Sequence, residues 1–244
     1  MMRMLPNADV YWNPWHGCRK VSEGCKNCYV YFLDRRYGRD ASVIFRTKTV
    51  FNLPITRTRE GVFKHPKGTT FMTCFNSDFF LEDADPWRPE AWDIMRQRQD
   101  CAFFLMTKRP ERIAQNFPED REHFQHLMIG VSTENQAAAD RRLPGFLSFD
   151  LPYHGIMVGP ILETVDLRPY LATGKVNQVT VSGESYEGAR VTRYDDVRSI
   201  YLQCKEFNVP FHFLQTGNLW FQDGEIHHVA RAKQRSLAKT IVFE

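Results

Sequence analysis

Short apolar segments recur along the chain, and polar or glycine residues follow each of them. The segments are rich in β-branched and aromatic residues and show little alternation, which is typical of strands buried on both faces. Seven strands are predicted in this way, at residues 8–12, 69–73, 102–106, 127–131, 155–158, 176–181 and 210–214.

Amphipathic helical patterns lie between these strands, at residues 26–37, 89–98, 110–116, 134–142 and 192–207. Pro89 and Pro110 suit the first turn of a helix, where a missing N–H removes no hydrogen bond. Strands that alternate with helices predict an α/β fold, here a partial (β/α) TIM-like barrel of about six to seven parallel strands. We expect one domain over residues 1–244, with a possible insertion at 42–67 and a C-terminal extension at 218–244.

Polar residues stand directly after most of the predicted strands. Active sites of parallel α/β folds lie at the carboxyl ends of the strands, so these residues are candidates for a ligand-binding mouth. Helix caps and turns are the alternative role for each of them, because Ser, Asp and Asn favour such positions. The residues are Asn13, His16, Asn76, Ser77, Asp78, Thr107, Lys108, Arg109, Ser132, Glu134, Asn135, Ser182, Gly183, Glu184, Gln215 and Thr216.

The composition of the 244 residues is that of an ordinary globular protein, with 43% hydrophobic and 25% charged residues. A net charge of +3 gives no strong long-range field, although it leaves room for a local basic groove. The sequence has neither an apolar run long enough to span a membrane nor a secretory leader, so we expect a cytoplasmic protein without membrane contact. In a reducing cytoplasm, clustered cysteines bind metal more often than they form disulfides.

Three of the six cysteines, Cys18, Cys25 and Cys28, form a C-x6-C-x2-C motif after the first predicted strand. Three thiolates leave one position open, whereas structural zinc sites and electron-transfer clusters usually have four protein ligands. A Cys3His zinc site with His16, or three structural thiols without a metal, are the alternatives. Cys74, Cys101 and Cys204 are scattered and are interpreted as buried small hydrophobic residues.

A [4Fe–4S] cluster held by three cysteines leaves one iron that can bind S-adenosylmethionine through its amino and carboxylate groups. Reductive cleavage of this cofactor yields a 5′-deoxyadenosyl radical, so the hard chemistry belongs to the cofactor. An external electron donor of the flavodoxin or ferredoxin type is implied.

The sequence resembles a family of phage and bacterial proteins of uncharacterised function that is itself regarded as similar to radical S-adenosylmethionine enzymes. The matching blocks run in order from Tyr11 to Gly217 and are WNPWHGCRKVSEGCKNCY, FNSDFF, LMTKRPERI, IGVSTENQAAADRR, VSGES and NVPFHFLQTG. The resemblance implies a radical-enzyme type of partial barrel, a cluster on Cys18, Cys25 and Cys28, and S-adenosylmethionine across the strand ends. Two features depart from the commonest pattern: the first cysteine gap is six residues instead of three, and Asn76-Ser77-Asp78 replaces Gly-Gly-Glu.

Position along the implied fold assigns the candidate cofactor contacts. Ser77 and Asp78 follow the second strand, where the methionine amino group is bound. Ser132 and Glu134 are candidates for the methionine carboxylate or the ribose, and Glu184 is a further candidate. Tyr29 would shield the cluster or stack on adenine, with a plain core role as the alternative.

Lys108 and Arg109 form a basic pair at a strand end that suits a carboxylate or phosphate of the substrate, with an exposed helix start as the alternative. We therefore expect a radical S-adenosylmethionine enzyme that acts on a nucleobase, a nucleotide or phage DNA. A non-enzymatic nucleic-acid- or protein-binding module stapled by zinc or a cluster is the second hypothesis. A non-radical S-adenosylmethionine-dependent transferase ranks lowest, because cysteines occupy the place of its glycine-rich loop.

Overall fold

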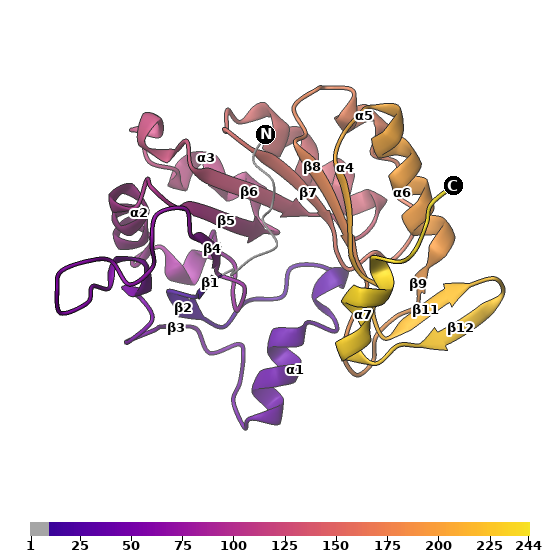
Figure 1. The fold of residues 1–244 in the computed structure, drawn as a ribbon, viewed down its shortest axis with the longest axis horizontal. Helices are drawn as coiled ribbons and strands as arrows, with labels where there is room; N and C mark the ends of the chain where they lie inside the picture. The colour runs from indigo at the N-terminus through magenta and orange to yellow at the C-terminus, as the bar shows by residue number, and fades with distance from the viewer. Residues whose placement is uncertain (1–9) are drawn as a thin grey trace. The chain divides into compact units, whose positions relative to one another are not determined.

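The computed structural model describes residues 10–244, whose elements are shown in Figure 1. The main sheet has the strand order β1-β4-β5-β6-β7-β8-β10, an open order with β1 and β10 at its ends. These strands are β1 (Val10–Trp12), β4 (Thr70–Thr73), β5 (Ala102–Thr107), β6 (Leu127–Ser132), β7 (His154–Val158), β8 (Gln178–Ser182) and β10 (Phe211–Gln215). All seven predicted strands are therefore present, although residues 8 and 9 of the first prediction lie outside the described residues.

The chain divides into two compact units. Within the described residues, the first comprises 10–19, 40–130 and 151–153, and the second comprises 20–39, 131–150 and 154–244. In the first unit β1 pairs with β4 and β4 with β5, both in parallel. In the second unit β7 pairs with β8 and β8 with β10, also in parallel. These pairings confirm the prediction of an α/β fold with a parallel sheet.

Aromatic side chains fill the core of the first unit. Phe71 on β4 and Phe103 on β5 are fully buried, and their rings stack with centroids 5.0 Å apart. Trp12 packs edge-on against Phe103 at 5.5 Å, and its indole N–H donates to the Phe51 carbonyl oxygen. Burial of one such side chain stabilises the fold by about 1.5–3 kcal/mol, which explains why these strands read as continuous apolar runs.

Residues 42–67 form the small structures that an insertion would give. Strand β3 (Phe45–Arg46) pairs antiparallel with β2 (Trp15–His16), and a 3-10 turn, η2, follows at Leu53–Ile55. The remaining helices of this unit are α2 (Arg88–Gln97) and α3 (Ile113–Asn116), with 3-10 turns η3 (Glu82–Ala84), η4 (Pro110–Arg112) and η5 (Arg121–Phe124). The predicted helix at 110–116 is thus a 3-10 turn that leads into a short α-helix.

The helices of the second unit are α1 (Tyr29–Arg36), α4 (Gln136–Ser148), α5 (Arg168–Leu171), α6 (Tyr194–Glu206) and α7 (Arg231–Ala238). Helix α4 begins after Asn135, whose side chain accepts the Ala138 N–H at 2.9 Å. It continues six residues beyond the predicted end at Arg142, although Pro144 lies inside it. Leu143, Phe146 and Leu147 are buried and extend its apolar stripe, so packing outweighs the helix-breaking residue.

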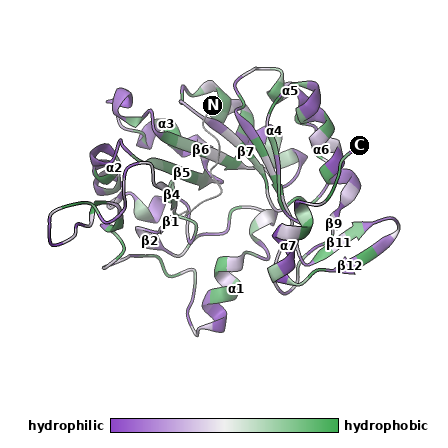
Figure 2. Ribbon diagram, in the orientation of Figure 1, coloured by the Kyte–Doolittle hydropathy of each residue, from purple (hydrophilic) through white to green (hydrophobic). Residues whose placement is uncertain are grey.

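Helix α1 begins later than predicted, because residues 26–28 form a turn in which the Cys28 N–H donates to the Cys25 carbonyl oxygen. Hydrophobic and hydrophilic stretches alternate along this helix in Figure 2, as expected of an amphipathic helix.

A second sheet of three strands lies in this unit. Strands β11 (Leu219–Gln222) and β12 (Glu225–His228) form a hairpin, and β9 (Thr192–Arg193) pairs in parallel with β11. His227 and His228 both lie in β12, and the hairpin turn is at Asp223 and Gly224, which have positive φ angles. Across residues 10–244, no helix combines the length and the apolar character that crossing a membrane requires.

Candidate functional site

Gly17 and Cys18, at the start of the cysteine loop, are fixed to the segment that follows β4. Gly17 has φ +89°, and a Cβ atom there would lie 2.5 Å from the Val43 carbonyl oxygen, so only glycine fits. Its N–H donates to the Asn76 carbonyl oxygen at 3.2 Å, and the Ser77 hydroxyl donates to the Gly17 carbonyl oxygen. The predicted cofactor residue Ser77 therefore holds the backbone that precedes Cys18.

The Asp78 carboxylate ties the end of β4 to the end of β5. It is buried and accepts four hydrogen bonds, from the Phe80 N–H (2.9 Å), the Thr107 hydroxyl (2.7 Å), the Lys108 N–H (2.9 Å) and the Arg109 guanidinium (2.9 Å). Because the protein itself supplies four donors, this carboxylate is rigidly oriented and has little free accepting capacity. It acts in this structure as the group that positions Arg109.

Arg109 connects this carboxylate to the cysteine loop. It is 6% exposed, donates to the Arg19 carbonyl oxygen at 2.8 Å, and interacts with the Cys18 sulfur. Burial acts to lower the pKa of Arg109, but the charges of Asp78 and Cys18 outweigh it and raise this pKa above its ordinary value. The guanidinium is thus a permanent cation beside Cys18, while the side chain of its neighbour Lys108 is half-buried.

The C-terminal half of the loop belongs to the second unit. Cys25 ends the 3-10 turn η1 (Glu23–Cys25), and its sulfur lies 3.9 Å from the Ser22 hydroxyl oxygen. Cys28 is the N-cap of α1, so the free N–H groups of the first helical turn lie next to it. Such a helix end favours negative charge, which suits a thiolate.

Glu134, two residues after β6, packs against the C-terminal half of the cysteine loop (hereafter the half-loop). Its carboxylate is 1% exposed and pairs with Arg142 of α4, at 2.7 Å and 3.4 Å. Arg142 also donates to the carbonyl oxygen of Ser132, another predicted cofactor residue, at 2.7 Å. Gly24 packs on the Glu134 side chain so closely that a Cβ atom would lie 2.9 Å from its carboxyl carbon.

Glu184 is the corresponding carboxylate after β8, and it binds the half-loop by hydrogen bonds. Asn27 donates to it at 3.1 Å, and Arg190 donates through its backbone N–H at 2.8 Å and through its guanidinium. Arg190 also donates to the Glu23 carbonyl oxygen at 3.2 Å. Burial acts to raise the pKa of Glu184, but the bonds from Arg190 and Asn27 outweigh it and hold this pKa below its ordinary value of 4.5.

A lowered pKa at Glu184 predicts a pH-dependent contribution to stability. The ionised group stabilises the fold above its unfolded-state pKa near 4.5, and this contribution disappears as pH falls through the lower folded-state value. We expect Glu184→Gln to lower the free energy of unfolding by about 1–2 kcal/mol at pH 7, and by much less at pH 3. Urea denaturation at several pH values measures this difference. Glu187→Gln, at an exposed carboxylate of the same loop, is the control. If the free energies of unfolding of Glu184→Gln and the wild type differed by the same amount at every pH, the role of the ionised Glu184 would be contradicted.

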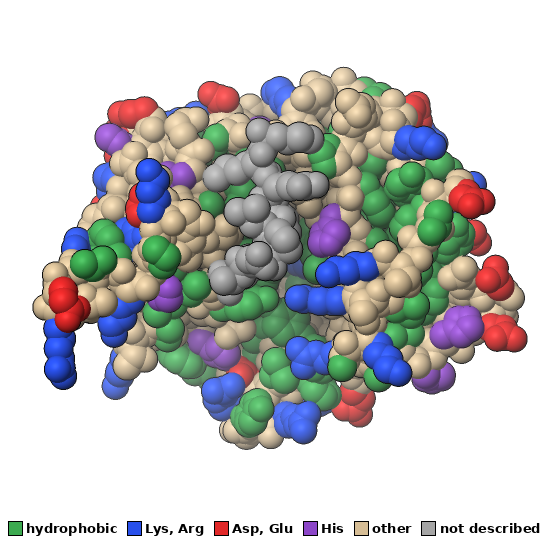
Figure 3. Space-filling view, in the orientation of Figure 1, with side chains coloured by type: hydrophobic (Ala, Val, Ile, Leu, Met, Phe, Trp, Pro, Cys, Tyr) green, Lys and Arg blue, Asp and Glu red, His purple; other side chains and the backbone are tan. Residues whose placement is uncertain are grey.

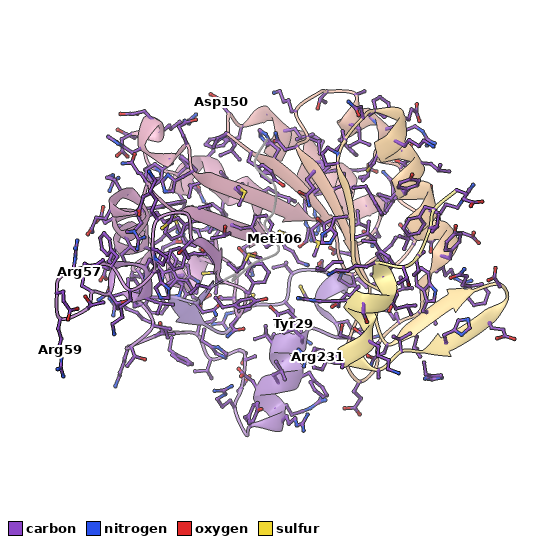
Figure 4. The ribbon with its side chains drawn as sticks, viewed as in Figure 1. Tyr29, Arg57, Arg59, Met106, Asp150 and Arg231 are labelled. Carbon is purple, nitrogen blue, oxygen red and sulfur yellow. The ribbon has the colours of Figure 1, made fainter. Side chains whose placement is uncertain are left out.

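Tyr29 lies directly after Cys28, and 36% of its surface is exposed, so it is not a core ring. Its ring, labelled in Figure 4, stacks on that of Tyr186, with centroids 6.4 Å apart. Tyr186 in turn contacts Phe32 at 4.7 Å. An exposed aromatic face therefore stands next to the last cysteine of the motif.

The cysteines divide into two groups by their environment. Cys18, Cys25 and Cys28 are partly exposed thiols, whereas Cys74, Cys101 and Cys204 are buried, as predicted, and none of the six forms a disulfide. Within residues 10–244, no three His, Cys, Asp or Glu side chains are arranged as a metal site. The donor chemistry of the loop fits an iron–sulfur cluster, and loading one requires the three thiols to converge.

Sequence reasoning missed the partners of the strand-end carboxylates, Arg142, Arg190 and Asn27. The signal for Arg142 was weak, since it lies eight residues after Glu134, about two turns into the helix that begins at Gln136. Arg190 and Asn27 carry no such spacing signal, because a loop and a distant turn bring them to Glu184.

The chain was compared with known protein families, curated proteins and solved structures. A family model described as a protein of unknown function (DUF5131) matches residues 4–242. No curated protein and no solved structure matched the chain.

Proposed function

We propose, from the premise that the chain belongs to the DUF5131 family, that it is a radical S-adenosylmethionine enzyme with a [4Fe–4S] cluster on Cys18, Cys25 and Cys28. One observation carries this proposal: each half of the cysteine loop is fastened to the carboxyl ends of parallel strands in its own unit. Arg109 binds the first half through Arg19, and Glu184 binds the second half through Asn27.

When bound, the cluster would supply one-electron reduction of S-adenosylmethionine, with the electron coming from a flavodoxin- or ferredoxin-type donor. Cleavage of the C–S bond would give methionine and a 5′-deoxyadenosyl radical, which abstracts hydrogen from the substrate. The residues around the thiols would lower the electrostatic free energy needed to bring three negatively charged thiolates together. Arg109 is a permanent cation beside Cys18, and the first turn of α1 offers N–H groups beside Cys28. A reducing cytoplasm would keep the thiols available.

Three carboxylate–arginine pairs stand after alternate strands. Asp78 with Arg109 follows β4, Glu134 with Arg142 follows β6, and Glu184 with Arg190 follows β8. All three carboxylates are buried and already accept hydrogen bonds from the protein, so we assign the pairs to positioning the residues around the cofactor. Ser77 directly precedes Asp78, the Ser132 carbonyl oxygen accepts from Arg142, and Tyr29 directly follows Cys28, where its ring would shield the cluster.

The substrate class that we propose is a nucleobase-containing molecule, a nucleotide or phage DNA. A cationic side chain at a strand end suits the phosphate of such a substrate. Lys108 is the candidate, because its neighbour Arg109 is already bound to Asp78 and to the Arg19 carbonyl oxygen.

Anaerobic purification tests the proposal. We expect brown protein with about four irons and four sulfides per chain, which cleaves S-adenosylmethionine to 5′-deoxyadenosine and methionine under dithionite. Colourless protein with one zinc per chain would instead support a zinc-stapled binding module. Iron-loaded protein that never yields 5′-deoxyadenosine would also overturn the radical assignment.

A further inference from the structure

Helix α7 carries a stripe of cations without acidic partners. Arg231 and Arg235 of α7 and its C-cap residue Lys239 follow one another at intervals of four residues, so they lie along one side of the helix about 6 Å apart. Residues 231–240 contain no Asp or Glu. All three side chains are exposed, and within residues 10–244 none of them pairs with a carboxylate. Figure 3 shows Lys and Arg side chains gathered around this helix.

A buried glutamine fixes α7 to the carboxyl ends of β8 and β10. Gln234 is 0% exposed; its amide oxygen accepts the Ser185 hydroxyl at 2.7 Å, and its amide nitrogen donates to Asn218 at 2.6 Å. Gln215 at the end of β10 donates to the same Ser185 hydroxyl. The cations are therefore held at the end of the sheet where the cysteine loop is attached, rather than on a freely moving tail.

The stripe begins at an aromatic cluster. Tyr29 and Arg231 are labelled in Figure 4. The Arg231 guanidinium lies over the Tyr186 ring, 4.6 Å from its centroid, and Tyr186 stacks against Tyr29. This contact fixes the direction of a side chain that would otherwise be mobile in solvent. A cation and the exposed ring of Tyr29 are thereby held close to each other, one residue after Cys28.

The other end of the stripe lies near His212 on β10. Burial lowers the pKa of His212, and the nearby charges of Lys239 and Arg235 lower it further. The imidazole is therefore neutral near pH 7, so it adds a hydrogen-bonding group to the cationic stripe and no charge of its own.

We propose that the stripe on α7 binds the phosphate backbone of a single-stranded nucleic acid, with Tyr29 stacking one of its bases. Three cations in register cover about 12 Å, which suits successive phosphates of a polynucleotide better than the single phosphate group of a mononucleotide. A base in a single strand is free to stack, whereas a duplex hides it. A single-stranded nucleic acid would then be the substrate of the proposed radical reaction, and this part rests on the proposed function. Binding of the strand to α7 does not, because it can be measured without turnover.

Anaerobically purified protein and a fluorescein-labelled thymidine 12-mer test the proposal by fluorescence anisotropy at several salt concentrations. Replacing Arg235 and Lys239 together by Gln removes two charges and keeps good helix formers. We expect about tenfold weaker binding, and a log–log salt slope that is smaller in magnitude by about 1.4. The control replaces Arg141 on α4 and Lys205 on α6 by Gln, which makes the same change of charge on other exposed helix positions and leaves binding within about twofold.

Tyr29→Ala should weaken binding about tenfold with an unchanged salt slope, because it removes stacking and no charge. Equal losses in the α7 and control variants, tighter binding of duplex than of single-stranded 12-mer, or equal binding of polyglutamate would each overturn the inference. Iron content is measured on the same samples. Wild-type protein that holds no iron but binds the 12-mer would refute the proposed enzyme and leave the binding surface intact. Wild-type protein that holds iron but does not bind the 12-mer would refute only the surface.

Discussion

Cys25→Ser protein, purified without oxygen, is expected to hold almost no iron and to produce no 5′-deoxyadenosine. Three thiolates are the whole protein ligand set of the proposed cluster, so removing one leaves two, too few to hold it. Cys25 is the most informative of the three, because the residues on either side of it are already bound. Glu23 accepts from Arg190 and Asn27 donates to Glu184, so the loop keeps its backbone anchors when the sulfur is lost.

The matched control is Cys204→Ala on α6. Cys204 is 1% exposed, and burial raises its pKa to about 12, so it is an inert core thiol. We expect this variant to keep its iron and to lose about 1 kcal/mol of stability. His16→Gln separates the zinc alternative, since it should leave iron loading unchanged. Wild-type iron content in Cys25→Ser protein, with unchanged circular dichroism, would show that Cys25 is not a ligand.

The central strands β4 to β8 were predictable because they are largely buried on both faces and consist mostly of apolar residues. Phe71 and Phe103, for example, are fully buried in β4 and β5. The polar residues after the strands were predictable because they directly follow these apolar segments, at the strand ends where parallel α/β folds place their sites. Asp78, Glu134 and Glu184 were recognised as candidates in this way, and all three lie at strand ends in the structure.

What the sequence could not reveal depends on contacts between distant segments. Helix α4 continues past Pro144 because Leu143 and Phe146 are buried against the rest of the unit, which outweighs a local propensity. Strand β9 is two residues long and exists only because β11 pairs with it. The hydrogen bonds that saturate Asp78 are a further example: a carboxylate that reads as a ligand for the cofactor is already occupied by β5 and the residues after it.

Breaking the Asp78–Arg109 pair is expected to give a large loss of stability. Both side chains are less than 9% exposed and lie 2.9 Å apart, so removing one partner leaves the other charge buried without compensation. Arg109→Met and Asp78→Asn should each lower the free energy of unfolding by about 3–5 kcal/mol. The double variant should lose about 1–2 kcal/mol less than the sum of the two, because the partners interact directly.

The readout that separates positioning from plain stability is iron loading. Arg109 binds the Arg19 carbonyl oxygen next to Cys18, so Arg109→Met should load less iron than Asp78→Asn at equal folded fraction. Arg109→Lys should rescue stability only in part, since an ammonium group cannot reach the carboxylate and the carbonyl oxygen with the same fork geometry. Glu90→Gln, which breaks the exposed pair with Arg46, should cost less than about 1 kcal/mol under the same urea titration. Strict additivity of the Asp78 and Arg109 variants would mean that the pair does not couple β4 to β5, and that the cysteine loop is held by other contacts.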